Sequence, residues 1–315
     1  MKKEADRILK RSVLSVLVAA ALYTPQAMAE FTEVVTEGST VIGETVENGI
    51  QTVESGGTAE NTTIDNGGRQ TVFGTATDTT INNGGWQIVF STADKTTINK
   101  GGAQSVYGTA TDTTIYDGGT LSVDSGGKAT GVDQKKGAAL IATTATGTVV
   151  KGQYENGAFF IENGQADNVL LENGGRLDVV DGTTANNTTI RDGGELIVNR
   201  GGTTLNTGIE SGGLQTVSAG GKTEDTIINE GGLMQNAGED TGTTVKGGGV
   251  YELGRYNAGS TDYPDYLYYG TAGASDLTME AGGRATVYAG TLTGATVSGK
   301  DASLTLMTPQ TETYD

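Results

Sequence analysis

The stretch 62–72 reads Thr-Thr-Ile-Asp-Asn-Gly-Gly-Arg-Gln-Thr-Val, and it returns at 79–89 as Thr-Thr-Ile-Asn-Asn-Gly-Gly-Trp-Gln-Ile-Val. The pattern comes again at 96–106 and at 113–123, so four copies follow one another at a spacing of 17 residues. A fixed period of this length is typical of stacked units that bury their apolar faces against each other. Thr, Ile and Val favour extended backbone, whereas Asn-Gly-Gly favours a turn. Each copy is therefore expected to form short strands separated by turns.

Gly pairs continue along the chain with a spacing of 19 residues, at 174–175, 193–194, 212–213 and 231–232. We therefore predict an all-β fold, a right-handed parallel β-helix (a solenoid) of about 14 coils with 17–20-residue repeats, over residues 30–306. Coils are expected to begin near Thr130, Thr148 and Asn168, among other places. The spacing doubles between Thr243 and Leu277, which predicts either a Tyr-rich insertion or a degenerate coil at 250–275. Residues 307–315 are expected to form a tail.

The first residues predict a secretory signal. A basic start is followed by the apolar run 13–22 and by Ala-Met-Ala at 27–29, which is typical of a signal-peptidase site. We expect residues 1–29 to be a signal peptide and the rest of the chain to be secreted.

Composition excludes several functions. The chain has no His and no Cys, so Ser-His-Asp or Cys-His catalysis and His- or Cys-ligated zinc are excluded. Its net charge of −18 disfavours nucleic acid as a partner. We expect no cofactor, no metal site and no enzymatic activity. The alternative from another class is a β-helix enzyme that degrades polysaccharides, because the fold alone does not decide function.

Alternation along a strand assigns the inner face. The Val that ends each pattern is expected to point inward, and the residue two positions earlier shares its face. That residue is Gln in several coils, and stacked Gln side chains can form an amide ladder. The predicted structural ladder consists of Gln51, Gln70, Gln87 and Gln104.

The residues that follow or alternate with the inward Val are expected to point outward, and several of them are aromatic. A Tyr-rich segment further along the chain is the second candidate, because Tyr is common in recognition surfaces. An exposed apolar strip on an acidic protein is a candidate contact surface. The predicted contact surface comprises Phe73, Trp86, Ile88, Phe90, Tyr107, Tyr256, Tyr263, Tyr266, Tyr268 and Tyr269.

The Thr-Thr-Ile-x-x-Gly-Gly-x-Gln-x-Val repeat and the stretch 160–179 resemble the passenger region of antigen 43 and of the AIDA-type self-associating autotransporter adhesins. The resemblance covers about residues 34–300. It implies a β-helix passenger on the surface of a Gram-negative bacterium, which aggregates cells, promotes biofilm and adheres to host surfaces.

The resemblance also implies partners. These are a second copy of the passenger on a neighbouring cell, a host surface glycan or protein, and a translocator β-barrel. No translocator β-barrel is expected in this chain. The expected location is the cell surface, outer membrane or exterior if a translocator exists elsewhere, and otherwise the periplasm. A truncated product or an inert structural stalk is the alternative function.

Overall fold

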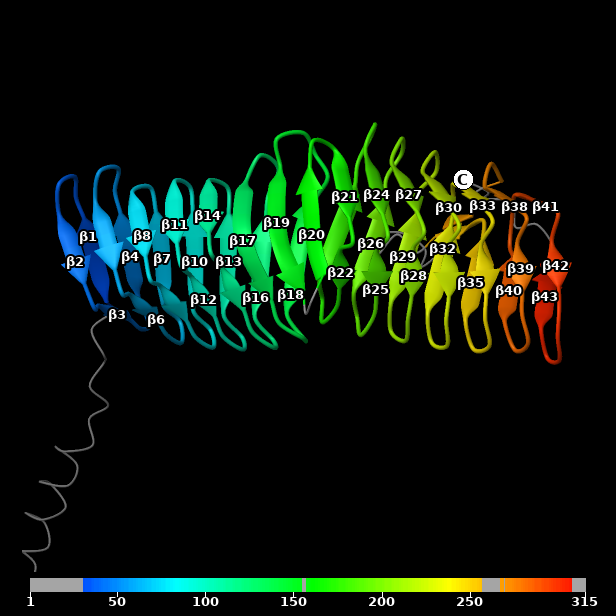
Figure 1. Cartoon of the computed structure of the whole chain (residues 1–315), viewed down its shortest axis with the longest axis horizontal. Helices are drawn as coiled ribbons and strands as arrows, with labels where there is room; N and C mark the ends of the chain where they lie inside the picture. The colour runs from blue at the N-terminus through cyan, green and yellow to red at the C-terminus, as the bar shows by residue number, and fades with distance from the viewer. Residues whose placement is uncertain (1–30, 155–156, 257–266, 269, 308–315) are drawn as a thin grey trace, which may run out of the picture. The chain divides into compact units, whose positions relative to one another are not determined.

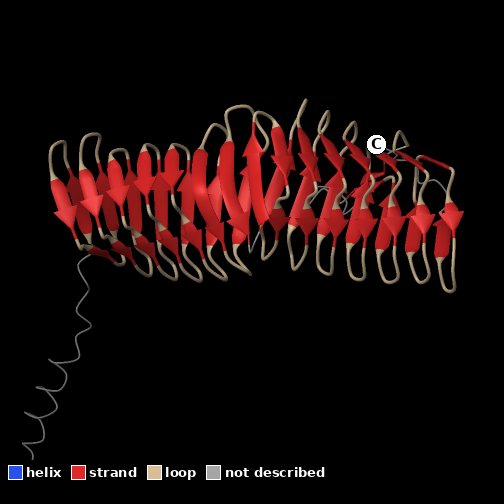
Figure 2. Cartoon of the chain, viewed as in Figure 1, coloured by secondary structure: helices blue, strands red, loops and turns tan. Residues whose placement is uncertain are grey.

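The computed structural model describes residues 31–154, 157–256, 267–268 and 270–307. Within these ranges the chain consists of strands and turns and contains no helix (Figure 2). Among these residues, accordingly, no helix is found that could span a membrane. The strands form coils that stack side by side (Figure 1), and the predicted parallel β-solenoid of about 14 coils is confirmed.

Each regular coil contributes one strand to each of three faces. Face A is a sheet of 14 described strands that follow one another in chain order. Its strands are β1 Thr32–Val35, β4 Ile50–Val53, β7 Arg69–Val72, β10 Trp86–Val89, β13 Ala103–Val106, β16 Thr120–Val123, β18 Ala139–Thr143, β23 Arg176–Val179, β26 Glu195–Val198, β29 Leu214–Val217, β32 Leu233–Asn236, β35 Val250–Leu253, β40 Arg284–Val287 and β43 Ser303–Leu306.

Face B follows face A in each coil. Its strands are β2 Thr40–Ile42, β5 Thr58–Glu60, β8 Thr75–Thr77, β11 Thr92–Asp94, β14 Thr109–Thr111, β17 Lys128–Gln134, β19 Val149–Tyr154, β20 Gly157–Glu162, β21 Gln165–Asp167, β24 Thr184–Asn186, β27 Thr203–Leu205, β30 Lys222–Glu224, β33 Glu239–Thr241, β38 Gly273–Ser275 and β41 Thr291–Thr293.

Face C closes the coil, and β17 and β19 extend into it. Its own strands are β3 Thr45–Val46, β6 Thr63–Ile64, β9 Thr80–Ile81, β12 Thr97–Ile98, β15 Thr114–Ile115, β22 Leu170–Leu171, β25 Thr189–Ile190, β28 Gly208–Ile209, β31 Ile227–Ile228, β34 Thr244–Val245, β39 Thr278–Met279 and β42 Thr296–Val297.

The core is narrow and consists of columns of like residues. Face A contributes the Val that ends most of its strands, such as Val72 and Val89, face B contributes an Ala such as Ala76, and face C contributes an Ile such as Ile81. All four of these side chains are fully buried. Burial of one Val or Ile stabilises a fold by roughly 1.5–3 kcal/mol, so each short coil relies on the repetition of this small contribution.

Corner length explains the two repeat spacings. Two residues connect face A to face B after β7, β10 and β13, whereas four residues make the same connection after β16, β23 and β26. The coils with the short corner are those with the 17-residue spacing, and the coils with the long corner have the 19-residue spacing. Strand pairing stays in register through both kinds of coil, because the difference is confined to this corner.

A single left-handed residue makes the corner from face B to face C. Asn61, Asp78 and Asp112 hold this place with φ of 52°, 52° and 51°, and Lys95 holds it with φ of 53°. Asn and Asp tolerate this conformation better than other residues with a Cβ, whereas Lys is strained there. Asn61 is therefore the bend that precedes the face C strand β6.

Lys95→Asn is expected to raise the free energy of unfolding by about 0.5–1 kcal/mol, because Asn adopts the left-handed conformation at lower cost. Urea denaturation followed by circular dichroism measures the change. Lys100→Asn is the matched control, since it removes the same charge from an exposed residue without a positive φ. An equal gain in both variants would assign the effect to charge and contradict the strain argument.

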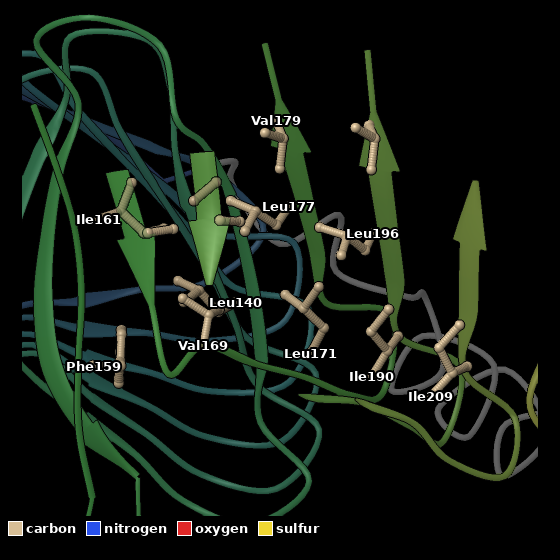
Figure 3. Close-up of a cluster of buried hydrophobic side chains, with 14 of the residues drawn as sticks. Leu140, Phe159, Ile161, Val169, Leu171, Leu177, Val179, Ile190, Leu196 and Ile209 are labelled. Atoms are coloured by element: carbon tan, nitrogen blue, oxygen red, sulfur yellow. The ribbon is translucent and has the colours of Figure 1, made fainter. Parts of the chain in front are cut away.

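The prediction that a regular coil begins at Thr148 is wrong. β19 pairs in parallel with β17, but β20 then returns antiparallel to β19, and β21 runs antiparallel to β20. Phe159 and Ile161 of β20 are buried in the core beside Leu140 and Val169 (Figure 3). A Cβ at Gly152 would lie 2.4 Å from the Val132 carbonyl oxygen of β17 and 2.9 Å from the Phe159 ring, so this glycine allows both the preceding strand and the returning strand to approach closely. Three consecutive strands, β19, β20 and β21, therefore run back and forth on face B, where a single strand was expected.

Face A changes register at the same place. β16 and β18 pair Val123 with Ala142, but β18 and β23 pair Ala142 with Leu177, two residues earlier than the regular pattern gives. Two residues of a strand span about 6–7 Å. The later coils are therefore offset along the strand direction from the earlier ones, and we call this offset the register step.

Strand pairing also passes over the segment that begins after β35. β33 pairs with β38, β34 with β39 and β35 with β40, so these strands are direct neighbours. β36 Arg255–Tyr256 and β37 Leu267–Tyr268 pair with each other in antiparallel orientation and, among the described strands, with no other.

Candidate contact surface

The four Gln side chains of the predicted ladder lie inside the solenoid and are fully buried. Gln70 donates from Nε2 to Oε1 of Gln51, Gln87 to Gln70, and Gln104 to Gln87, each over 2.7 Å. Glu33 accepts from Gln51 at the start of the ladder. Each ladder Gln from Gln70 onward also donates to the buried first Thr of a Thr-Thr pair, as Gln104 does to Thr96 over 3.0 Å. The ladder is therefore structural and does not reach the surface.

Phe73, Phe90 and Tyr107 form a continuous exposed column, which we call the aromatic ridge. Their rings stack with centroids 5.0 and 5.1 Å apart and interplanar angles of 6° and 16°. Each side chain remains 46–47% exposed. Since the faces of neighbouring rings cover each other, the ridge presents mainly ring edges to solvent. All three residues stand at the short corners between faces A and B.

Trp86 and Ile88 lie on the outer side of β10, just before Phe90. Trp86 is 42% exposed, and its Nε1 donates to Oγ of Ser105 over 3.1 Å. Ile88 lies between Thr71 and Ser105 and is less exposed than Trp86, because it is half-buried. The apolar surface expected from the sequence therefore continues from the ridge onto face A mainly through Trp86.

Most of the Tyr-rich segment named in the predicted contact surface lies outside the described residues. Tyr263, Tyr266 and Tyr269 lie outside the described residues, and only the backbone of Tyr256 and Tyr268 is described, in β36 and β37. Tyr251, which opens this segment in the sequence, is fully buried and stacks between Met234 and Ala285 in the column that Gln occupies elsewhere. Alignment of its coil on the preceding Gly residues 247–249 would have placed it inside.

Two clusters, one beside β19 and one at β36, each consist of an Arg, a Glu and a Tyr. Arg191 donates from Nε to Oε2 of the buried Glu172 over 2.9 Å and from Nη2 to the hydroxyl of Tyr154. Burial lowers the pKa of Arg191, but the hydrogen bond and charge of Glu172 outweigh it and raise the pKa.

In the second cluster, Arg255 of β36 donates from Nη1 to Glu252 over 3.1 Å and to the Tyr288 hydroxyl over 2.7 Å. The Arg255 guanidinium also lies 4.7 Å from the centre of the Tyr288 ring. Repeat spacing does not predict these clusters, because each joins residues of different coils: Arg191 lies 37 residues from Tyr154, and Arg255 lies 33 residues from Tyr288.

A further buried polar cluster, separate from the Gln ladder and from the two Arg clusters, surrounds Asp240 of β33. Oδ1 of Asp240 accepts from Thr243 over 2.6 Å, whereas Oδ2 has no hydrogen-bond partner within 3.5 Å. Burial raises the pKa of Asp240 to about 7, although the hydrogen bond from Thr243 lowers it in part. Burial and the charge of Asp240 raise the pKa of Tyr251 well above its ordinary value, so its hydroxyl stays protonated.

No group of three or more His, Cys, Asp or Glu side chains within the described ranges is arranged to hold a metal ion. What the structure displays instead is a filled core with outward side chains repeated in columns along the flank. These features define the class of β-solenoids that offer a long side surface rather than a single enclosed site. The chain belongs to the passengers of AIDA-type bacterial autotransporter adhesins.

Three comparisons support this assignment. The family model described as an adhesin of the bacterial autotransporter system, probable stalk, matches residues 151–213 and 205–249. The probable autotransporter YpjA of Escherichia coli K12 is 41% identical over 173 residues, which are 55% of this chain and 8% of YpjA. The crystal structure of a TibC-catalysed, hyper-glycosylated TibA fragment is 31% identical, with a TM-score of 0.50 over 90% of this chain and 94% of the fragment.

A more distant solenoid also aligns. The A-module of the mannuronan C-5 epimerase AlgE4 of Azotobacter vinelandii matches at 11% identity over 92% of each chain, with a TM-score of 0.33. A likeness at this level carries no argument about activity.

Proposed function

We propose that the chain is the passenger of a secreted, surface-displayed adhesin, and that it associates with copies of itself on neighbouring cells. The aromatic ridge is the observation that carries the proposal. Isolated exposed apolar residues need no explanation, but three stacked and half-exposed rings beside Trp86 form a continuous apolar strip.

The form of the ridge favours a protein as the partner over a glycan. Sugars bind aromatic side chains through the ring face, and here the faces of Phe73, Phe90 and Tyr107 are largely turned toward one another. Ring edges that follow one another at about 5 Å suit a contact with apolar and aromatic side chains of a second protein surface.

The net charge of −18 gives self-association a distinct salt dependence. Two copies repel each other at long range, and added salt screens this repulsion, so association should strengthen from about 0.01 M to about 0.15 M salt. A cationic partner would show the opposite trend, because salt weakens attraction between opposite charges.

Replacement of both Phe73 and Phe90 by Ser is expected to slow the settling of bacteria that display the chain and to weaken association of the purified protein about tenfold or more. Settling assays and sedimentation measure the two effects. Tyr116→Ser is the matched control, because Tyr116 is equally exposed at 46% but lies outside the ridge.

Circular dichroism of each variant separates loss of contact from loss of fold. Normal settling by a correctly folded double variant would contradict the proposal. That outcome would favour the second candidate, a stalk that only holds other parts of a longer protein away from the cell, which the description of the matching family model supports.

We further propose that the chain acts without catalysis. Its relatives are autotransporter and adhesin passengers. Depolymerisation of neutral or acidic polysaccharides by the purified chain, with or without calcium, would overturn this part of the proposal.

A further inference from the structure

The register step interrupts an otherwise regular surface and leaves a cavity of about 400 Å³ on the outside of face A. Eleven residues line it. Those that decide what the cavity can bind are Asp124, Ile141, Arg176, Asp178, Val180 and Asn199. The eleven residues come from β16, β18 and β23 and from the corners that follow β16, β23 and β26.

The two-residue offset is the physical cause of this cavity. Arg176 pairs with Ile141 and Asp178 with Thr143, so the corner after β23 reaches further along the strand direction than the corner after β16. A ligand in this cavity contacts β18 at the bottom, and it contacts the coils before the register step on one side and the coils after it on the other. Elsewhere on face A the strands β4 to β16 and β23 to β35 stay in register, so no equivalent step arises there.

Specific hydrogen bonds at both ends of β18 stabilise the register step. In the regular coils a turn glycine donates to the turn of the next coil, as Gly118 does to Gly137 over 2.8 Å. At the step, Gly137 instead donates to Oε1 of Glu172 over 2.6 Å, and the Asn173 side chain donates to the Gly137 carbonyl over 2.8 Å. At the other end of β18, Oγ1 of the buried Thr144 accepts from the backbone N–H of Val180 over 3.1 Å.

The lining alternates hydrogen-bonding and apolar groups. Arg176 donates from Nε and Nη2 to a single oxygen, Oδ1 of Asp178, over 3.0 and 2.8 Å. This leaves Oδ2 of Asp178 able to accept from a ligand. Asp124 adds a second carboxylate, Asn199 both a donor and an acceptor, and Ile141 and Val180 add half-buried apolar surface.

We infer that this cavity binds a neutral oligosaccharide. The volume lies within the range of small-ligand sites, roughly 300–1,000 Å³. Sugar hydroxyls both donate and accept, as the mixed lining requires, and their C–H faces suit Ile141 and Val180. Two carboxylates against one paired Arg, on a chain of net charge −18, disfavour sialylated, sulfated and uronic-acid glycans. The inference does not depend on self-association through the aromatic ridge.

The test uses the full chain on an array of neutral and acidic glycans. We expect binding to neutral glycans only, and about tenfold weaker binding when Asp124 or Asn199 is replaced by Ala, since each change removes hydrogen bonds to the ligand. Ser125→Trp fills the cavity and is expected to abolish binding. Arg176→Ala is expected to weaken binding as well, and Arg284→Ala is its matched control, because Arg284 is exposed in the same face A column as Arg176 but lies outside the cavity.

Equal binding by the Ser125→Trp variant, a preference for acidic glycans, or binding of a polylysine peptide in place of glycans would each overturn the inference. So would the absence of any neutral glycan ligand at millimolar concentration. Settling of cells that display the same variants is measured in parallel. Because the cavity and the ridge involve different residues, a failure of one proposal is distinguishable from a failure of the other.

Discussion

Asp240→Asn is expected to raise the free energy of unfolding at pH 8 by roughly 2–4 kcal/mol. Burial raises the pKa of Asp240 from 3.8 to about 7, so the folded protein binds this proton more tightly than the unfolded chain does. The contribution of Asp240 to stability is therefore complete below about pH 4 and declines as the pH rises through about 7. Above that pH the folded protein holds a buried carboxylate, one oxygen of which has no hydrogen-bond partner.

Urea denaturation of the wild type and the variant between pH 4 and pH 8 measures this effect. The difference between the two proteins should grow with pH and level off above about 7. Asp112→Asn is the control, because it removes the same charge from an exposed side chain. A difference that stays constant over the whole range would show that Asp240 does not titrate in this window.

Gln87→Leu is expected to lower the free energy of unfolding by about 2–4 kcal/mol, although Leu occupies the same column at Leu121, Leu177 and Leu196. Gln87 stands in the middle of the ladder, where it donates to Gln70 and accepts from Gln104. Its loss leaves the buried Oε1 of Gln70 without a donor and removes one acceptor from Gln104.

Gln104→Leu should cost about 1 kcal/mol, because Gln104 ends the ladder beside Leu121 and Thr96 still donates to Gln87 over 3.5 Å. Thermal and urea unfolding of the two variants compare the positions directly. If Gln87→Leu and Gln104→Leu lower the free energy of unfolding equally, the ladder stabilises the fold through packing rather than through its amide hydrogen bonds.

Much of the regular architecture could be predicted from the sequence, because each coil repeats the same local rules. Strand alternation places Val72 and Gln70 on the inner face, and both are buried. It also places Phe73 and Phe90 outside, where they are exposed and stacked. The family resemblance and the parallel solenoid are confirmed by the comparisons and by the strand pairing.

The departures from regularity could not be predicted in the same way. The segment around Thr148 has the Val, Thr and Gly content of a strand and turn, and this content does not decide whether the next strand runs parallel or antiparallel. Pairing of β20 with β19 decides it, and that pairing depends on the burial of Phe159 and Ile161. The cavity at the register step depends on the same tertiary contacts, so the sequence analysis did not identify it.

At the corner between faces A and B, the number of residues changes without altering the pairing of the strands. Since two or four residues connect the same pair of strands, insertions or deletions at this corner leave the neighbouring hydrogen bonds intact. Gene variation in such a protein can then alter what projects from the flank while the scaffold remains foldable. Change of the exposed surface and preservation of the scaffold thus fall on different positions of one repeat.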